Sequence, residues 1–124
     1  MGSKKKVLMA DDSKTALMMA TTALRAMPYE IVTAADGEEA LQKALASPPD
    51  AVVLDVMMPK LDGFEVCRRL RASDTTKHLP IIMLTTRGES QNRETGRDCG
   101  ATEYLTKPLD TAEFLRKLKA HLGE

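Results

Sequence analysis

Three carboxylates directly follow apolar runs, at the points where buried strands would end. Asp11 and Asp12 come after residues 7–10, and Asp55 comes after residues 51–54. Neighbouring carboxylates repel one another, so a cluster of three favours a bound cation. Oxygen ligands with no histidine or cysteine nearby favour Mg²⁺ or Mn²⁺ over zinc. The spacing therefore predicts a divalent-cation site formed by Asp11, Asp12 and Asp55.

A hydroxyl and an ammonium group stand at the ends of two further apolar runs. Thr85 ends the run at 81–85, and Lys107 follows residues 102–106. Taken singly, Thr85 is an ordinary strand residue, Lys107 a solvated turn residue and Asp12 a helix cap. Together they suggest phosphoryl chemistry, because an aspartate can attack phosphorus and a cation and lysine can stabilise the charge in transit. The cluster therefore predicts a phosphoryl-transfer site.

The sequence alternates between strand and helix patterns, and the predicted strands would position these residues. Apolar runs predict five strands, at residues 6–10, 30–34, 51–54, 81–85 and 102–106. Five strands that alternate with helices predict an α/β fold with a parallel sheet covered on both faces, doubly wound by right-handed crossovers. Ligands bind such sheets outside the carboxyl ends of the strands. The second strand ends in alanines and is expected at a sheet edge, away from the site.

Apolar residues at helical spacing predict the helices between these strands. The predicted helices cover residues 13–27, a stretch from 36 to about 46, a short stretch after the turn at 58–63, residues 90–99 and residues 111–122. The second is expected to turn Ala40, Leu41, Ala44 and Leu45 inward. The segment 90–99 contains Asn, Thr and Gly, which weaken a helix, so it is expected to open locally at low cost.

Length and composition predict one domain over residues 1–124, with 1–5 as a flexible lead-in. Eighteen basic and eighteen acidic residues balance, which argues against nucleic acid as the main partner. No apolar run approaches the ~20 residues of a membrane span, so no membrane partner is expected. Two cysteines, Cys67 and Cys99, indicate a reducing compartment. We expect a cytoplasmic domain.

Several residues that can bind metals have simpler explanations. His78 and His121 lack acidic or cysteine neighbours at ligand spacing, and His121 is expected to complement a helix dipole. Met9, Met57 and Met83 lie in or beside predicted strands, where packing explains them best.

The motif set resembles that of response-regulator receiver domains in two-component signalling, over essentially the whole chain. The matching residues, in chain order, are Asp11-Asp12, Asp55, Met58-Pro59, Asp62-Gly63, Thr85, Gly100-Ala101, Tyr104 and Lys107-Pro108. The resemblance implies a flavodoxin-like strand order, 2-1-3-4-5.

The resemblance also implies a metal site and a phosphoacceptor. Asp55 resembles the phosphoacceptor, and Asp12 and Asp55 resemble the side-chain ligands of Mg²⁺ or Mn²⁺. Asp11 resembles a ligand that acts through water, and the backbone carbonyl of Met57 resembles a further ligand.

The resemblance assigns the remaining residues to signalling. Thr85 and Tyr104 resemble the switch pair, and Lys107 resembles the phosphoryl-binding lysine. The implied donor is a histidine kinase or phosphotransfer protein, and the implied target is a downstream protein or a fused output domain. A receiver is a phosphoacceptor that assists its own phosphorylation and dephosphorylation, not an enzyme. Its face formed by the helix at 90–99, strand five and helix five would control the target.

The residues that border the path of an attacking water predict a long-lived phosphate. Met57 and Arg87 stand two residues beyond Asp55 and Thr85, and neither offers a carboxylate or amide to orient water.

Two other kinds of protein with similar folds match the sequence less well. A haloacid-dehalogenase-type phosphotransferase expects Asp-x-Asp after the first strand, where this chain has Asp11-Asp12-Ser13. A flavodoxin-like flavin protein expects a glycine-bearing phosphate loop, and residues 13–15 contain no glycine. A receiver fold that docks partners independently of phosphorylation stays open, and so does the choice between a stand-alone domain and part of a longer regulator.

Overall fold

The computed structural model describes residues 5–86, 100–107 and 110–122, with the backbone alone at Thr86 and Lys107. The strands are β1 (Lys5–Ala10), β2 (Tyr29–Ala34), β3 (Ala51–Asp55), β4 (Ile81–Thr86) and β5 (Glu103–Lys107). The helices among these residues are α1 (Lys14–Arg25), α2 (Gly37–Ala46), α3 (Gly63–Ala72) and α5 (Thr111–Leu122). The helix expected at 90–99 lies outside the described residues. No helix within the described ranges is long and apolar enough to cross a membrane.

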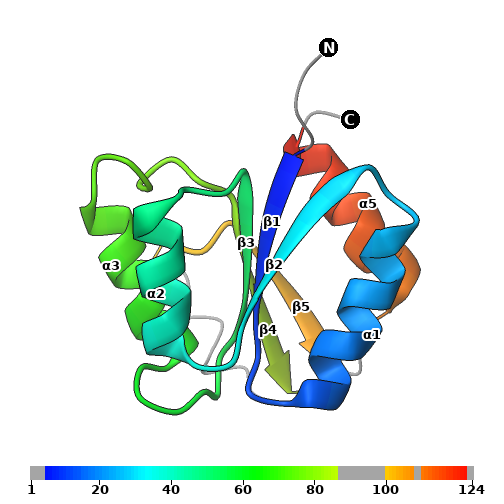
Figure 1. Ribbon diagram of the computed structural model, residues 1–124, viewed down its shortest axis with the longest axis horizontal. Helices are drawn as coiled ribbons and strands as arrows, with labels where there is room; N and C mark the ends of the chain where they lie inside the picture. Colours follow the sequence, from blue (N-terminus) through cyan, green and yellow to red (C-terminus); the bar gives the residue numbers. More distant parts are fainter. Residues whose placement is uncertain (1–4, 87–99, 108–109, 123–124) are drawn as a thin grey trace.

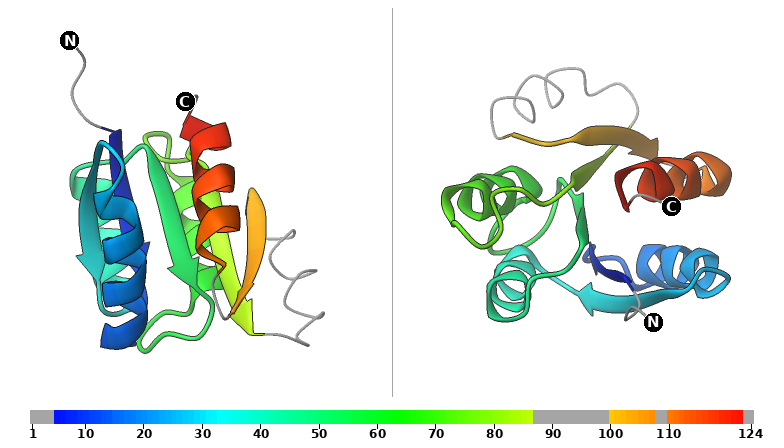
Figure 2. Two further views of the ribbon diagram at one scale, coloured as in Figure 1. Left: turned by 90° about the vertical axis from the view of Figure 1, so that its right-hand side faces the viewer. Right: turned by 90° about the horizontal axis from the view of Figure 1, so that it is seen from above.

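The five strands point the same way and all strand pairs are parallel (Figure 1). Their order is β2-β1-β3-β4-β5, as the right-hand view of Figure 2 shows. This order confirms the predicted α/β doubly wound fold and places β2 at an edge. Every strand therefore runs toward the same edge of the sheet, where the predicted site residues lie at or just beyond the carboxyl ends of β1, β3, β4 and β5.

Helices α1 and α5 cover one face of the sheet, and α2 and α3 cover the other (Figure 2). Each layer encloses its own apolar cluster, and β3 contributes to both. Val52 and Leu54 lie in the cluster beneath α2 and α3, while Ala51 and Val53 lie in the one beneath α1 and α5. Burial on both faces explains why β3 is a continuous apolar run rather than an alternating one.

Helix starts are capped close to the ends of the preceding strands or loops. The side chains of Ser13, Asp36, Asp62 and Asp110 each accept a hydrogen bond from the backbone N–H three residues on, at 3.2, 2.8, 2.9 and 3.1 Å. These caps satisfy N–H groups that have no partner inside the helix. They fix how each helix leaves the functional edge.

Some predicted boundaries and faces are wrong. The first helix begins after Ser13, which caps it, and ends at Arg25 because residues 26–28 form a turn. Strand β5 is displaced by one residue and reaches Lys107. Leu45 is 42% exposed, because α2 packs through Ala40 and Ala44 and the next position is rotated away from them.

His121 has an acidic neighbour that sequence spacing did not reveal. Its Nε2 lies 2.9 Å from Glu103 Oε2 at the start of β5, and Lys117 Nζ lies 3.3 Å from the other oxygen. Hydrogen bonds from His121 and then Lys117 hold the pKa of Glu103 below its ordinary value, although burial opposes them. The group fastens the last turns of α5 to β5.

A close approach at Gly37 generates a prediction for stability. An added Cβ would lie 1.8 Å from the carbonyl oxygen of Leu61, in the loop between β3 and α3. We expect Gly37→Ala to lower the free energy of unfolding by about 2–3 kcal/mol, because backbone must move to admit the methyl group. Urea unfolding followed by circular dichroism measures this change. The control Gln42→Ala, at an exposed position of α2, should stay within about 0.5 kcal/mol of wild type. Equal stability of both variants would refute the steric account.

Candidate acidic metal and phosphoryl site

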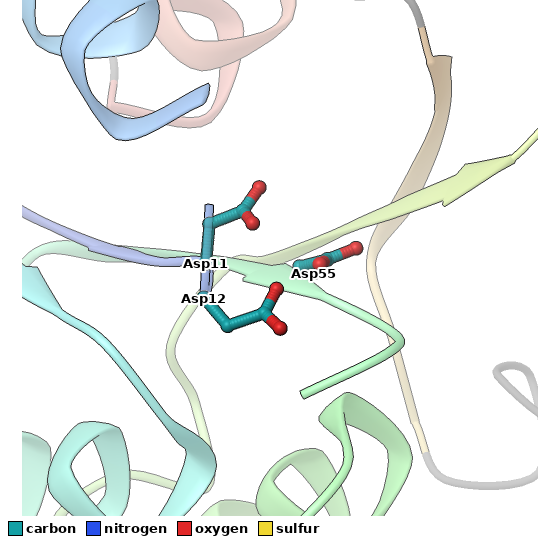
Figure 3. Close-up of side chains that lie close together, drawn as sticks. All are labelled: Asp11, Asp12 and Asp55. Carbon is teal, nitrogen blue, oxygen red and sulfur yellow. The ribbon is translucent and has the colours of Figure 1, made fainter. Parts of the chain in front are cut away.

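The three carboxylates meet at the carboxyl ends of two neighbouring strands. Ala10 of β1 is in register with Leu54 of β3, so Asp11 and Asp55 follow paired residues. One carboxylate oxygen from each of Asp11, Asp12 and Asp55 lies within 4.8 Å of the others. Figure 3 shows the three side chains extending from this edge of the sheet. The structure thus brings together the carboxylates that the sequence predicted.

Two members of the cluster are nearly inaccessible to solvent. Asp11 is 1% exposed and Asp55 is 6% exposed, whereas Asp12 is exposed. Asp11 Oδ1 accepts a hydrogen bond of 3.0 Å from the backbone N–H of Ser13, the residue that caps α1. Asp12 is therefore not the helix cap, and its carboxylate remains available to the cluster. Water screens repulsion within such a buried group poorly, so a divalent cation fits the donor set.

The first residue of α3, Gly63, packs against the backbone of Asp55. Gly63 donates from its N–H to the carbonyl oxygen of Val56 at 2.9 Å. A Cβ on Gly63 would lie 2.5 Å from the carbonyl oxygen of Asp55 and 2.9 Å from Met83 Cε. Val56 in turn donates to Leu84 of β4 at 3.1 Å. The backbone on either side of Asp55 is thus held by both α3 and β4.

The hydroxyl residue lies on the next strand. Asp55 is in register with Leu84, so Thr85 stands one residue beyond it at the same edge, and is 2% exposed. Tyr104 of β5 pairs with Met83 and is half-buried against the cluster beneath α2 and α3. The backbone of Lys107 pairs with Thr86, which places Lys107 at the carboxyl end of β5. Arg87 and Pro108 lie outside the described residues.

Met57 departs from its expected packing role. It is 67% exposed, because the chain leaves the sheet after Asp55 and Met57 lies in the following loop. Its position two residues past Asp55 nevertheless places its backbone at the functional edge.

Sequence reasoning missed the residue that shapes this loop. Lys60 adopts φ of 70°, in the left-handed region that few side chains enter. Its ammonium lies 3.7 Å from Asp36 Oδ2, and Gly37 donates to the carbonyl of Pro59 at 3.3 Å. A lysine in a polar turn carries no local signal of this conformation, although the Met58–Gly63 motif marked the turn itself.

Comparison with known proteins matches this architecture. The family model of the response regulator receiver domain matches residues 7–119. The chain is 43% identical over 118 residues to the alkaline phosphatase synthesis transcriptional regulatory protein PhoP of Bacillus subtilis, which covers 95% of this chain and 48% of PhoP. The chain thus spans about half the length of the first curated relatives that it matches.

Solved structures agree with the match. A putative response regulator from Chloroflexus aurantiacus superimposes with a TM-score of 0.93 at 39% identity, covering 98% of this chain and 99% of that one. The receiver domain of the sensor histidine kinase PA1611 from Pseudomonas aeruginosa, described with a magnesium ion coordinated in its active site cleft, gives 0.90 at 30% identity, covering 98% and 99%.

Fold, acidic edge and comparisons define a signalling domain of the two-component class. The chain belongs to the response regulator receiver domain family. Its aspartate cluster corresponds in kind to the acidic site at which receiver domains typically bind Mg²⁺.

The cluster generates a prediction about cations. We expect Asp12→Asn to raise the melting temperature in cation-free buffer, because it removes one of three mutually repelling charges. The same variant should bind Mg²⁺ or Mn²⁺ about 10-fold or more weakly, a loss of about 1.4 kcal/mol or more. Thermal unfolding with and without the cation, together with calorimetric titration, measures both effects.

The matched control is Asp74→Asn, whose side chain is 95% exposed and follows the carboxyl end of α3. It should respond to Mg²⁺ as wild type does. An Asp12→Asn variant with the full cation response would exclude Asp12 as a ligand.

Proposed function

We propose that this chain is a phosphorylation switch that accepts a phosphoryl group on Asp55 from a histidine kinase or phosphotransfer protein. The observation that carries the proposal is the convergence of Asp11, Asp12 and Asp55 within 4.8 Å at the carboxyl ends of β1 and β3. Asp55 is the acceptor of choice because it ends a fully buried strand and is itself held by α3 and β4.

The reaction requires one bond to form and one to break. A carboxylate oxygen of Asp55 attacks the phosphorus of a phosphohistidine, and the P–N bond to the donor imidazole breaks. The imidazole keeps the electron pair of that bond, and Asp55 becomes an acyl phosphate. In this step the fixed backbone of Asp55 limits the carboxylate to a narrow range of approach.

Other residues would stabilise the transferred charge. Mg²⁺ would be held by Asp11, Asp12, Asp55 and the backbone carbonyl of Met57. When bound, the cation would neutralise charge on the carboxylates and on the phosphoryl oxygens. Thr85 would donate its hydroxyl proton to a phosphoryl oxygen, and Lys107 would pair with another.

The pairing of β4 with β5 supports a route from the site to a partner. Thr85 is opposite Thr106, and two residues earlier Met83 is opposite Tyr104. Tyr104 is half-buried, so its ring can become more or less exposed when Thr85 moves. We propose that this change alters the face formed by residues 90–99, β5 and α5. A downstream protein or a fused output domain in the cytoplasm would read that face.

Phosphorylation of Asp55 is directly testable. With acetyl phosphate and Mg²⁺, we expect the intact mass to rise by one phosphoryl group, and Asp55→Asn to abolish the gain. Asp74→Asn is the control and should be labelled as wild type is. Full labelling of Asp55→Asn would reject the assignment. A folded wild type that takes no label but still binds its partner would instead favour a docking module independent of phosphorylation.

The lifetime of the phosphate provides a separate test. Hydrolysis needs a water aligned behind the phosphorus. Met57 is exposed two residues beyond Asp55, where its side chain would border that approach, and it has no group to orient the water. We expect Met57→Asn combined with Arg87→Glu to shorten the lifetime clearly, as measured by the decay of the phosphorylated mass. Met18→Asn is the control, since Met18 is equally exposed on α1. An unchanged or longer lifetime in the double variant would contradict this account.

A further inference from the structure

One arginine outside the acidic cluster joins three separate segments of the chain. Arg71, in the last turn of α3, donates from Nε to the carbonyl oxygen of Gly100 at 2.9 Å. Its Nη1 donates to the carbonyl oxygens of Lys77 and Leu79 at 2.9 and 2.6 Å, and Nη2 donates to Thr102 Oγ1 at 3.1 Å. A single guanidinium therefore links α3 to the residues that enter β4 and to those that enter β5.

The acceptor side of this contact is built to receive the arginine. Gly100 has φ of 94°, a conformation that side chains rarely adopt, and a Cβ there would lie 3.1 Å from Arg71 Cγ. The backbone conformation favours glycine at this position, and any side chain there would also press on the arginine that lies against it.

The same contact fixes the first rung between the two strands. Thr102 Oγ1 also accepts from the backbone N–H of Ile81 at 3.0 Å, and Thr102 N–H donates to the carbonyl of Ile81 at 2.8 Å. Arg71 thereby holds the side chain that aligns the start of β5 with the start of β4. Among the strands that the structure describes, β5 stands at the end of the sheet and has β4 as its one neighbour.

The register between β4 and β5 is set at their amino ends and determines which residues lie side by side at their carboxyl ends. It pairs Thr85 with Thr106 and Thr86 with Lys107 at the carboxyl edge. A slip by one residue would move the backbone of Lys107 by about 3.3 Å along the strand and turn its side chain to the opposite face. Within the described residues, the hydrogen bonds of Arg71 go to Gly100, Lys77, Leu79 and Thr102, and none goes to β1 or β3, at whose ends the aspartates lie.

We propose that Arg71 is a positioning residue for phosphoryl transfer: it fixes the amino ends of β4 and β5 and so keeps the backbone of Lys107 in register at the carboxyl edge of the sheet. The inference rests on the proposed function of Asp55. Lysine cannot replace this arginine, since one ammonium cannot serve acceptors on both sides of a planar, forked guanidinium.

The test measures the initial rate of labelling by acetyl phosphate at saturating Mg²⁺, with Mg²⁺ affinity measured separately by calorimetry. We expect Arg71→Ala to lower the labelling rate about 10-fold and Arg71→Lys to lower it less, because small displacements of a catalytic group reduce rates steeply. Mg²⁺ affinity should stay within about twofold of wild type, because the aspartates are untouched.

Two controls separate positioning from general loosening. Arg68→Ala removes a neighbouring arginine that forms an ion pair with Glu65 of the same helix. Cys67→Ala removes a buried side chain from that helix. Both should be labelled at the wild-type rate, even where Cys67→Ala melts as early as Arg71→Ala. In a Lys107→Ala background, Arg71→Ala should cause no further loss of rate, because the two changes act through one group.

Each result decides the matter. An unchanged rate in Arg71→Ala, an equal loss in Cys67→Ala, a parallel loss of Mg²⁺ affinity, or fully additive effects with Lys107→Ala would each overturn the role of Arg71. Failure of the wild type to be labelled would overturn the proposed function and this inference together, and the wild-type measurement identifies that case.

Discussion

Repulsion among three carboxylates is the constraint on which the rest of the structure depends. Asp11 and Asp55 are almost completely buried, and a carboxylate oxygen of each lies within 4.8 Å of a carboxylate oxygen of Asp12. Such an arrangement costs free energy in the absence of a cation, so contacts from the surrounding elements must keep the carboxylates in place. The N–H of Ser13 holds Asp11, and the close contact with Gly63 holds the backbone of Asp55. The stability for this comes from the two apolar clusters on either face of the sheet.

The parallel sheet makes that constraint possible. Because every strand runs in the same direction, residues far apart in sequence meet at one edge without any specific attraction between them. The helices leave this edge through side-chain caps, so the N–H groups at their starts are satisfied locally. The edge therefore combines a backbone held by neighbouring elements with polar side chains at the strand ends, which is what binding of a cation or a phosphoryl group requires.

The sequence predicted what depends on local pattern. Buried strands are continuous apolar runs, and a charge that ends such a run lies at the sheet edge, so the parallel sheet and the aspartate cluster could both be anticipated. The full strand order came from the resemblance to receiver domains, not from the pattern. Contacts between distant side chains have no such pattern. The hydrogen bonds from Arg71 to Gly100 and Thr102 could not be predicted from the spacing of residues in the sequence, and neither could the pairing of His121 with Glu103. The left-handed Lys60 was missed for the same reason, since its neighbours determine its conformation.

The contacts of Arg71 and of His121 both lie at the amino end of β5, and this location has a consequence for signalling. Arg71 acts just before β5 begins, and Glu103, the first residue of β5, binds Lys117 and His121 of α5. Both attachments therefore hold the amino end of β5, while Thr106 and Lys107 lie at the carboxyl end beside Thr85. A strand fastened at one end changes position most at the other. Under the proposed function, the carboxyl end of β5 near Lys107 can thus respond to events at Asp55, while the amino end keeps its register against β4.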